Sequence, residues 1–185
     1  MEPSIFFNAF ALITSVFGFR LIKNILNLHK KDMTHLKEGD KAPKFKAINC
    51  QGQTVGLENY KDKKLILFFY PKAMTPGCTT ETVNLATHYD LLKEKGFDVL
   101  GVSPDNQEKQ KRFKDKYNVP FSLIPDEQKE IIKLYGIWGP KKLYGREYEG
   151  VHRTTFIINE EGIIEHIIKK VKTKAHTEQI LSLYI

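Results

Sequence analysis

The most informative segment of the chain is Leu65-Ile-Leu-Phe-Phe-Tyr70-Pro71-Lys-Ala-Met-Thr75-Pro-Gly-Cys78-Thr-Thr-Glu81. It joins a continuous apolar run, typical of a strand buried on both faces, to a turn with proline and glycine and then to a predicted helix that begins with the thiol. A helix N-terminus offers unpaired backbone N–H groups and the positive end of the helix dipole, and both favour thiolate over thiol. The stretch therefore predicts a reactive cysteine at Cys78.

The segments after this stretch alternate between helix and strand patterns. Range 79–95 carries apolar residues at helical spacing, and range 97–102 is a second buried strand. A strand, a helix and a strand in this order predict two parallel strands with a right-handed crossover. Further helices are predicted near 106–117, near 127–135 and from about 174. Strands are predicted at 121–124, 154–158 and 163–169, and a hairpin within 44–56. An aromatic, glycine-rich connection spans 136–150. The predicted fold class is an α/β sandwich whose mixed sheet is parallel in its first half and antiparallel at its end.

Length and cysteine content restrict the class of protein. The chain has 185 residues and 41% hydrophobic content, enough for one domain with a substantial core. Its two cysteines, Cys50 and Cys78, are far apart and form no CxxC pair, which argues against a disulfide scaffold and a zinc site. The histidines show no ligand spacing either. We expect a reducing compartment, no metal and no cofactor.

The formal charge of +7 does not by itself indicate a nucleic-acid partner. Basic residues are spread through nearly every segment and alternate with acidic ones, as in 108–116. Such a pattern is typical of a solvated surface. We expect no specific nucleic-acid binding.

The amino terminus differs in composition from the rest of the chain. Residues 3–19 carry no charge and are followed by Arg20 and Lys23, the reverse of the order in a signal peptide. Three readings stay open for 1–32: an uncleaved membrane anchor, an interfacial helix, or an upstream extension that is not translated. The functional domain is predicted to span 33–185, from Met33. It is expected in the cytoplasm, and at the membrane if the extension is a real anchor.

The turn before Cys78 carries several candidate functional groups. Catalytic groups collect beyond the carboxyl ends of parallel strands, and Pro71 ends such a strand. Gly77 permits close approach of a substrate, and the Thr75 hydroxyl can bond to a thiolate or a peroxide oxygen. Each group has a structural alternative: Cys78 as a small buried hydrophobe, Thr75 as a helix cap, and Glu81 as a favourable charge near the helix dipole. The combination of Thr75 with Cys78 favours a reactive site, whereas the role of Glu81 stays open.

These residues resemble a known family. Pro71-x-x-x-Thr75-x-x-Cys78 is similar to the active-site signature of the peroxiredoxins, and Tyr70-Pro-Lys-Ala-Met-Thr-Pro-Gly-Cys78-Thr resembles their bacterioferritin comigratory protein, or Q-type, branch. The similarity runs from about Leu36 to the C-terminus, and includes Gly39-Asp-Lys-Ala-Pro43, Gly101-Val-Ser-Pro-Asp105 and Arg153-Thr-Thr-Phe-Ile-Ile158.

The resemblance implies a thioredoxin-like fold and an antioxidant enzyme of cell redox homeostasis that reduces hydrogen peroxide and organic hydroperoxides. Cys78 would be the peroxidatic thiolate and would become a sulfenic acid. Arg153 matches the catalytic arginine of the family, and would lower the thiol pKa and stabilise the transition state with Thr75. Pro71, Gly77 and Glu81 would surround the substrate.

One position departs from the family pattern. Many Q-type members carry a resolving cysteine five residues after the peroxidatic one, where this chain has Val83. Cys50 lies in the predicted amino-terminal hairpin, where no motif places it near Cys78. We therefore expect a monomer with a one-cysteine cycle, in which an external thiol such as thioredoxin reduces the sulfenic acid.

Two other functions could use a reactive cysteine in this fold. A thiol-disulfide oxidoreductase of thioredoxin type would need a CxxC pair, which is absent. A non-catalytic peroxide sensor or redox-controlled binding module needs only an oxidisable Cys78. Thr75 and Arg153 favour turnover.

Overall fold

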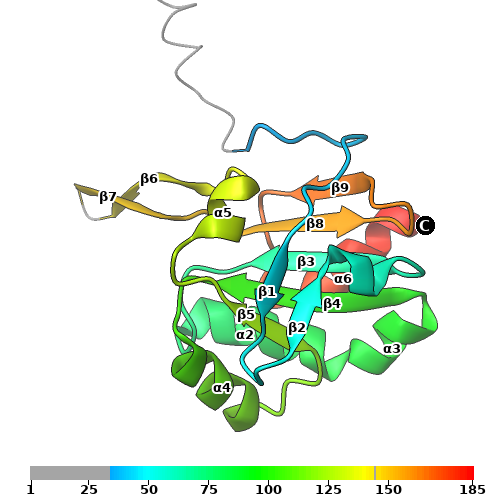
Figure 1. The fold of residues 1–185 in the computed structure, drawn as a ribbon, viewed down its shortest axis with the longest axis horizontal. Helices are drawn as coiled ribbons and strands as arrows, with labels where there is room; N and C mark the ends of the chain where they lie inside the picture. The colour runs from blue at the N-terminus through cyan, green and yellow to red at the C-terminus, as the bar shows by residue number, and fades with distance from the viewer. Residues whose placement is uncertain (1–33, 144) are drawn as a thin grey trace, which may run out of the picture. The chain divides into compact units, whose positions relative to one another are not determined.

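The computed structural model describes residues 34–143 and 145–185. The core of this part of the chain is a five-stranded sheet with the order β5-β4-β3-β8-β9 (Figure 1). Adjacent strands run parallel from β3 through β4 to β5, whereas β8 is antiparallel to both β3 and β9. These strands are β3 (Lys64–Phe69), β4 (Phe97–Ser103), β5 (Ser122–Pro125), β8 (Thr154–Ile158) and β9 (Ile164–Ile168). The predicted mixed sheet is therefore confirmed.

The apolar run that defines β3 is explained by burial on both faces of the sheet. Successive side chains of a strand point to opposite faces, so Leu65, Leu67 and Phe69 enter one core cluster while Ile66 and Phe68 enter the other. None of the five is more than 1% exposed. The strand lies at the centre of the sheet, and its last residue leads directly into the cysteine turn.

Helices and a small hairpin complete three layers. On one face, α2 (Pro76–Thr87), α3 (Tyr89–Glu94), α4 (Gln107–Lys116) and α6 (His176–Leu181) contribute Leu85, Leu92, Phe113 and Ile180 to the cluster around Phe68. On the other face lie the hairpin β1 (Lys46–Ile48) and β2 (Thr54–Gly56), the 3-10 helix η1 (Leu57–Tyr60) and α5 (Glu130–Leu134) (Figure 1). A second 3-10 helix, η2 (Ser182–Tyr184), follows α6.

Two elements differ from the sequence-based expectation. The helix predicted over 79–95 begins earlier, at Pro76, and it is interrupted at His88. There the His88 ring Nδ1 lies 2.8 Å from the Asn84 carbonyl oxygen, next to the main-chain bond of that turn. Cys78 is consequently the third residue of α2 and not its first.

The aromatic, glycine-rich connection over 136–150, to which no element was assigned from the sequence, contains a β-hairpin. Strands β6 (Trp138–Leu143) and β7 (Arg146–Val151) pair antiparallel and project beyond the central sheet (Figure 1). The sequence of β7 gives no strand signal, because its first four residues are exposed and only its last two are buried.

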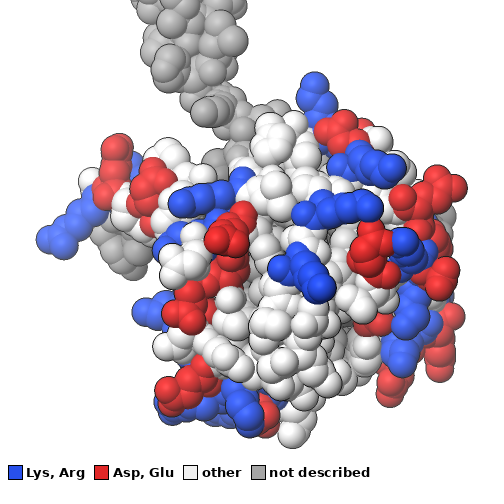
Figure 2. Space-filling model, in the orientation of Figure 1, with Lys and Arg blue, Asp and Glu red and all other residues white. Residues whose placement is uncertain are grey.

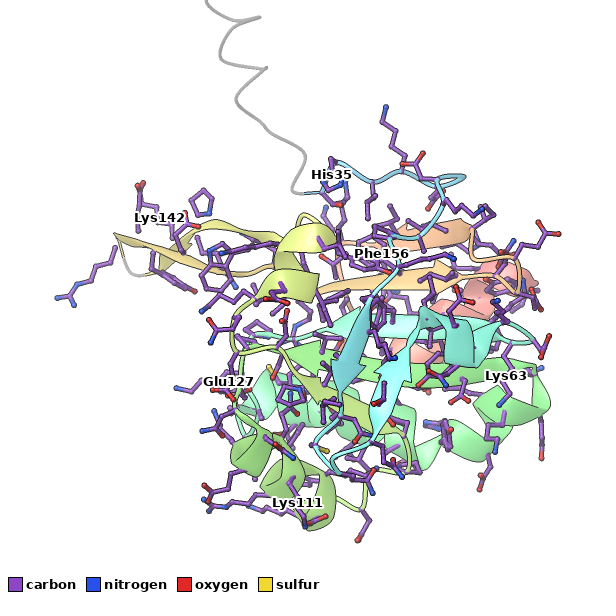
Figure 3. The ribbon with its side chains drawn as sticks, viewed as in Figure 1. His35, Lys63, Lys111, Glu127, Lys142 and Phe156 are labelled. Carbon is purple, nitrogen blue, oxygen red and sulfur yellow. The ribbon has the colours of Figure 1, made fainter. Side chains whose placement is uncertain are left out.

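Charge and side-chain orientation agree with a solvated exterior. Acidic and basic side chains are interspersed around the face in Figure 2, with an uncharged area between them. In Figure 3 the fully buried Phe156 lies within the fold, whereas Lys63, Lys111 and Lys142 lie at its periphery. The predictions for 1–32 fall outside the described residues. Among the residues described, we find no helix with the length and hydrophobicity needed to cross a bilayer.

Candidate active site

The cysteine turn places Cys78 where the central strand meets a helix. Thr75 occupies the N-cap position of α2, Pro76 begins the helix, and Cys78 lies in its first turn. Proline suits this position because its missing N–H would have no helical partner there. Cys78 is only 1% exposed. The thiol is thus held in a nearly closed environment close to unpaired backbone N–H groups.

Arg153 connects the turn to the opposite half of the sheet. It lies between β7 and β8, and its Nη2 is 3.2 Å from Cys78 Sγ. Its other terminal nitrogen, Nη1, donates to Oε2 of Glu81, one helical turn after Cys78. Burial lowers the pKa of Arg153, but the neighbouring Glu81 and Cys78 outweigh this effect and raise it overall. The guanidinium therefore stays charged beside the sulfur.

Glu81 lies behind Arg153 and away from solvent. Its side chain is 0% exposed, and burial raises the pKa of Glu81 to about 7, although the charge of Arg153 acts in the opposite direction. Its second oxygen, Oε1, has no hydrogen-bond partner among the described residues. Glu81 therefore holds Arg153 in place, and its expected position beside the substrate stays a prediction.

The turn itself is held by short-range bonds. The Thr75 hydroxyl donates to the Lys72 carbonyl at 2.8 Å and makes no side-chain capping bond, so its lone pairs stay open to another donor. A Cβ placed on Gly77 would lie 3.6 Å from Arg153 Nη2, which puts this backbone next to the guanidinium. Met74 has a φ of 66°. This left-handed conformation is uncommon for a side-chain-bearing residue, and the surrounding contacts must hold it in place.

Asp105, which the sequence analysis named only as the last residue of the motif Gly101-Val-Ser-Pro-Asp105, supports the cysteine turn. The Asp105 carboxylate, at the end of β4, accepts the Ala73 backbone N–H at 2.6 Å and the Ser103 hydroxyl at 2.8 Å. The Ser103 oxygen in turn accepts Gln110 Nε2 at 2.6 Å. A buried polar network therefore ties the cysteine turn to β4 and α4, and Asp105 is the residue that contacts the turn directly.

Two other positions bear on the resolution of a sulfenic acid: Val83, on the same helix as Cys78, and Cys50, between β1 and β2. Val83 is half-buried on α2. Cys50 is 1% exposed in the β1–β2 turn, where its backbone N–H donates to the Leu123 carbonyl of β5. Burial raises the pKa of the Cys50 thiol, with Lys114 acting in the opposite direction. Lys114, whose charge acts on Cys50, also donates to main-chain carbonyls just before the start of β5. Cys78, in contrast, follows the carboxyl end of the parallel strand β3.

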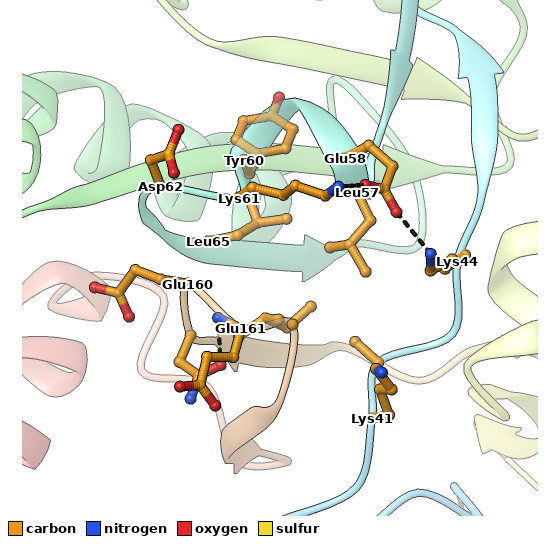
Figure 4. Close-up of a pocket in the computed structure, with 14 residues that line it drawn as sticks. Lys41, Lys44, Leu57, Glu58, Tyr60, Lys61, Asp62, Leu65, Glu160 and Glu161 are labelled. Carbon is orange, nitrogen blue, oxygen red and sulfur yellow. Dashed lines mark hydrogen bonds and ion pairs between the residues drawn. The ribbon is translucent and has the colours of Figure 1, made fainter.

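A separate cavity of about 530 Å³ opens near the start of β3 and the end of β8. Leu57, Leu65 and Ile158 contribute apolar surface to it, and Glu58 pairs with Lys44 and Lys61 at its rim (Figure 4). No group of three or more potential metal-ligating side chains occurs within 34–143 and 145–185.

Comparison with known proteins gives consistent matches. The AhpC/TSA family matches residues 38–167. Peroxiredoxin Bcp of Escherichia coli is 41% identical over 150 residues, which cover 81% of this chain and 96% of the relative. Peroxiredoxin Bcp of Bacillus subtilis is 42% identical over 143 residues, which cover 77% of this chain and 91% of the relative. The solved structure of the Xanthomonas campestris bacterioferritin comigratory protein has a TM-score of 0.71 and 26% identity, and it covers 81% of this chain and 96% of its own.

Fold and site together define a thiol peroxidase with the thioredoxin fold, in which helices flank a mixed sheet. The chain belongs to the AhpC/TSA family, within the bacterioferritin comigratory protein or Q-type branch of the peroxiredoxins.

Proposed function

We propose that this enzyme reduces peroxides through a sulfenic acid formed at Cys78. The observation that carries the proposal is the 3.2 Å contact between Arg153 Nη2 and Cys78 Sγ, in the first turn of a helix. A fixed positive charge and the helix dipole both stabilise a thiolate. The thiolate is the nucleophile that peroxide reduction requires.

The reaction step follows from this geometry. The Cys78 thiolate attacks the distal oxygen of the peroxide, so an S–O bond forms while the O–O bond breaks, and the sulfur is oxidised to sulfenic acid. The leaving oxygen takes up a proton and becomes an alcohol or water. Arg153 and the backbone N–H groups of Gly77 and Cys78 stabilise the charge that spreads over the breaking bond, while the Thr75 oxygen, whose own proton goes to the Lys72 carbonyl, accepts the peroxide O–H. Pro71 shapes the entrance to the turn.

We assign hydrogen peroxide and organic hydroperoxides as substrates. The site needs to recognise only an O–O–H group, which the Thr75 oxygen can accept and the Arg153 guanidinium can donate to. The work on the Xanthomonas campestris relative concerns its alkyl peroxide reduction activity, which supports an organic substrate here.

Reduction of the sulfenic acid is proposed to use an external thiol, for example on thioredoxin. Position 83 is valine and cannot attack a sulfenic acid. Cys50 is buried at the β5 side of the fold, and its raised pKa opposes thiolate formation. Since Cys78 is 1% exposed, an external thiol reaches it only after the first turn of α2 moves. We further propose that the functional unit is a monomeric domain over 33–185 that works in the cytoplasm.

The decisive test compares Cys78→Ser with Cys50→Ser as a matched control. We expect Cys78→Ser to abolish peroxide consumption with thioredoxin or a small thiol as reductant, and Cys50→Ser to retain it. Mass spectrometry after one equivalent of peroxide should find a sulfenic acid at Cys78. A disulfide between Cys50 and Cys78 would overturn the one-cysteine cycle. Oxidation of Cys78 without any turnover would indicate a sensor in place of a peroxidase.

A further inference from the structure

The carboxyl group of Glu81 has an unusual environment for a fully buried acid. Arg153 Nη1 holds one of its oxygens, Oε2. The other oxygen, Oε1, is buried and accepts no hydrogen bond from any described residue. A buried acceptor without a partner is costly for a carboxylate, but a protonated carboxyl places a hydrogen on one of these oxygens.

The side chain that faces Oε1 is His176, from the first residue of α6. Its Nε2 lies 3.9 Å from Glu81 Oε1, and both side chains are 0% exposed. Burial and, to a smaller extent, the charge of Arg153 lower the pKa of His176 to about 4, although the hydrogen bond to Gln179 acts in the opposite direction. A neutral imidazole carries one proton and presents one lone pair.

Neighbouring groups decide which nitrogen carries that proton. His176 Nδ1 lies 3.4 Å from Gln179 Oε1, and this oxygen already accepts the Lys172 N–H. Nδ1 is therefore the donor, which leaves Nε2 as an acceptor for the Thr155 hydroxyl at 2.9 Å. Nε2 therefore carries no proton that it could donate to Glu81 Oε1 at 3.9 Å, and a proton on Glu81 reduces the cost of leaving this carboxylate oxygen without a partner.

The charged groups around this pair come from several elements. Arg153 approaches from the β7–β8 connection and Cys78 from the same helix as Glu81. Lys141, on β6, interacts electrostatically with both Arg153 and Cys78. Thr155 is uncharged. Arg153 is thus the cation shared by Glu81 and Cys78.

We propose that Glu81 and His176 hold one proton behind Arg153, and that Glu81 releases it when Cys78 passes from thiolate to sulfenic acid. The inference rests on the proposed role of Cys78. Before reaction, Arg153 balances the thiolate while Glu81 is neutral. After reaction, the sulfur is neutral and the Glu81 carboxylate balances Arg153. The buried site keeps the same net charge throughout.

The proton balance follows directly. The thiolate, the peroxide and protonated Glu81 become the sulfenic acid, an alcohol or water, and the Glu81 carboxylate. The leaving oxygen forms as an anion and receives one proton from solvent, while Glu81 returns one proton to solvent. Glu81 and His176 act through Arg153, so they are positioning residues for the charge on Cys78.

Proton counting tests the proposal on the native protein. Cys78 is oxidised by one equivalent of hydrogen peroxide in weak buffer with a pH indicator, at about pH 6 and about pH 8, on either side of the Glu81 pKa of about 7. Thiolate absorbance is followed in parallel, and counts are expressed per thiolate oxidised. We expect almost no net proton uptake at the lower pH and close to one proton at the higher pH. Equal uptake at the two pH values would overturn the proposal.

Variants identify the group that releases the proton when Cys78 is oxidised. Glu81→Gln should take up about one proton at both pH values. His176→Gln replaces an acceptor by a group that can donate to Glu81 Oε1, so the transition should move about one pH unit lower. His166→Gln, on the half-buried histidine of β9, is the matched control and should leave the transition in place. A transition unchanged in Glu81→Gln would overturn the assignment, and one unchanged in His176→Gln would remove His176 from the pair.

This design separates the two proposals. If Cys78 is not oxidised by peroxide at all, the proposed function fails. If Cys78 is oxidised normally but the proton count does not depend on Glu81, only the present inference fails. Infrared difference spectra of the native protein give a readout that needs no variant, because oxidation should remove a protonated-carboxyl band; its persistence would contradict proton release.

Discussion

Arg153 Nη2 lies 3.2 Å from Cys78 Sγ, although 75 positions separate the two residues in the chain. The contact forms because β8 pairs antiparallel with β3, which brings the start of β8 beside the end of β3. The helix that follows β3 then carries the sulfur to the guanidinium. The guanidinium beside the sulfur thus comes from the other half of the sheet.

Replacing Arg153 by glutamine should lower the rate of Cys78 oxidation by about 10²- to 10³-fold, the typical effect of removing one group that stabilises a transition-state charge. Stopped-flow measurement of sulfenic acid formation gives this rate. Arg112→Gln, on the exposed surface of α4, is the control and should react like the native protein. A loss below threefold in Arg153→Gln would mean that the guanidinium does not act on the reacting sulfur.

Asp105→Asn should weaken the cysteine turn. The substitution removes the charge from the oxygen that accepts the Ala73 N–H, and an amide nitrogen in its place cannot accept. We expect the free energy of unfolding to fall by about 1–3 kcal/mol, and the peroxide rate to fall with it. Urea titration and stopped-flow kinetics measure the two effects. Asp115→Asn, at an exposed ion pair with Lys111, should change neither, and similar values for both variants would refute a positioning role.

Gly101→Ala should destabilise the protein through steric conflict in β4. An added Cβ would lie 2.6 Å from Leu123 Cδ2 and 2.8 Å from Phe68 Cζ, inside the packed core. Overpacking of this kind costs about 1–3 kcal/mol of unfolding free energy, which thermal or urea unfolding will detect. Gly139→Ala is the matched control, since its Cβ would come no closer than 3.8 Å to His152 Nε2. Equal stability of the two variants would show that the core around Gly101 is not tightly packed.

The pH dependence of stability should reveal Glu81 and His176 as opposing groups. Glu81 titrates at about 7 in the folded protein and at 4.5 as a model group, so its contribution is present below pH 4.5 and is lost as the pH rises to 7. His176 titrates at about 4 when folded and at 6.5 as a model group, so its contribution is present above pH 6.5 and is lost as the pH falls to 4. The two slopes oppose each other between pH 4.5 and 6.5.

Single variants should expose each slope in turn. Stability of Glu81→Gln should fall as the pH decreases from 6.5 toward 4, whereas stability of His176→Gln should fall as the pH increases from 4.5 toward about 6, because this substitution lowers the pKa of Glu81 by about one unit. The pKa differences correspond to a change on the order of 3 kcal/mol in Glu81→Gln and on the order of 2 kcal/mol in His176→Gln. Urea titrations across this range measure the slopes relative to the native protein. Identical pH profiles for the two variants would contradict the assigned pKa directions.

Several features of the site could be predicted from local sequence. An apolar run followed by Pro71, Thr75 and Cys78 predicted a buried strand, a turn and a helix, because each element depends on neighbours within a few residues. The same reasoning placed the paired strands of the mixed sheet. It did not find the β6–β7 hairpin, because the paired residues mix glycine, proline, aromatic and charged types and show no regular alternation of apolar and polar positions.

The long-range contacts of the site could not be predicted from local sequence patterns. His176 lies in a short terminal helix, and only the packing of α6 against α2 brings it to Glu81. Asp105 belongs to a motif that the sequence shows. Its hydrogen bond with Ala73 could not be predicted from that motif, because the bond depends on β4 lying parallel to β3. The resemblance identified Arg153, and the fold supplied its partner Glu81.

Local sequence is enough to specify the strand, the turn and the position of Cys78, since hydrophobic periodicity and backbone restriction by proline and glycine act over a few residues. The tertiary structure decided which charges surround the sulfur. Glu81 could have been a solvent-facing charge on the first turn of a helix, but sheet pairing and the docking of α6 enclose it between Arg153 and His176. Burial changes the proton affinity of a carboxyl group far more than its neighbours in sequence do, and burial is a property of the assembled fold.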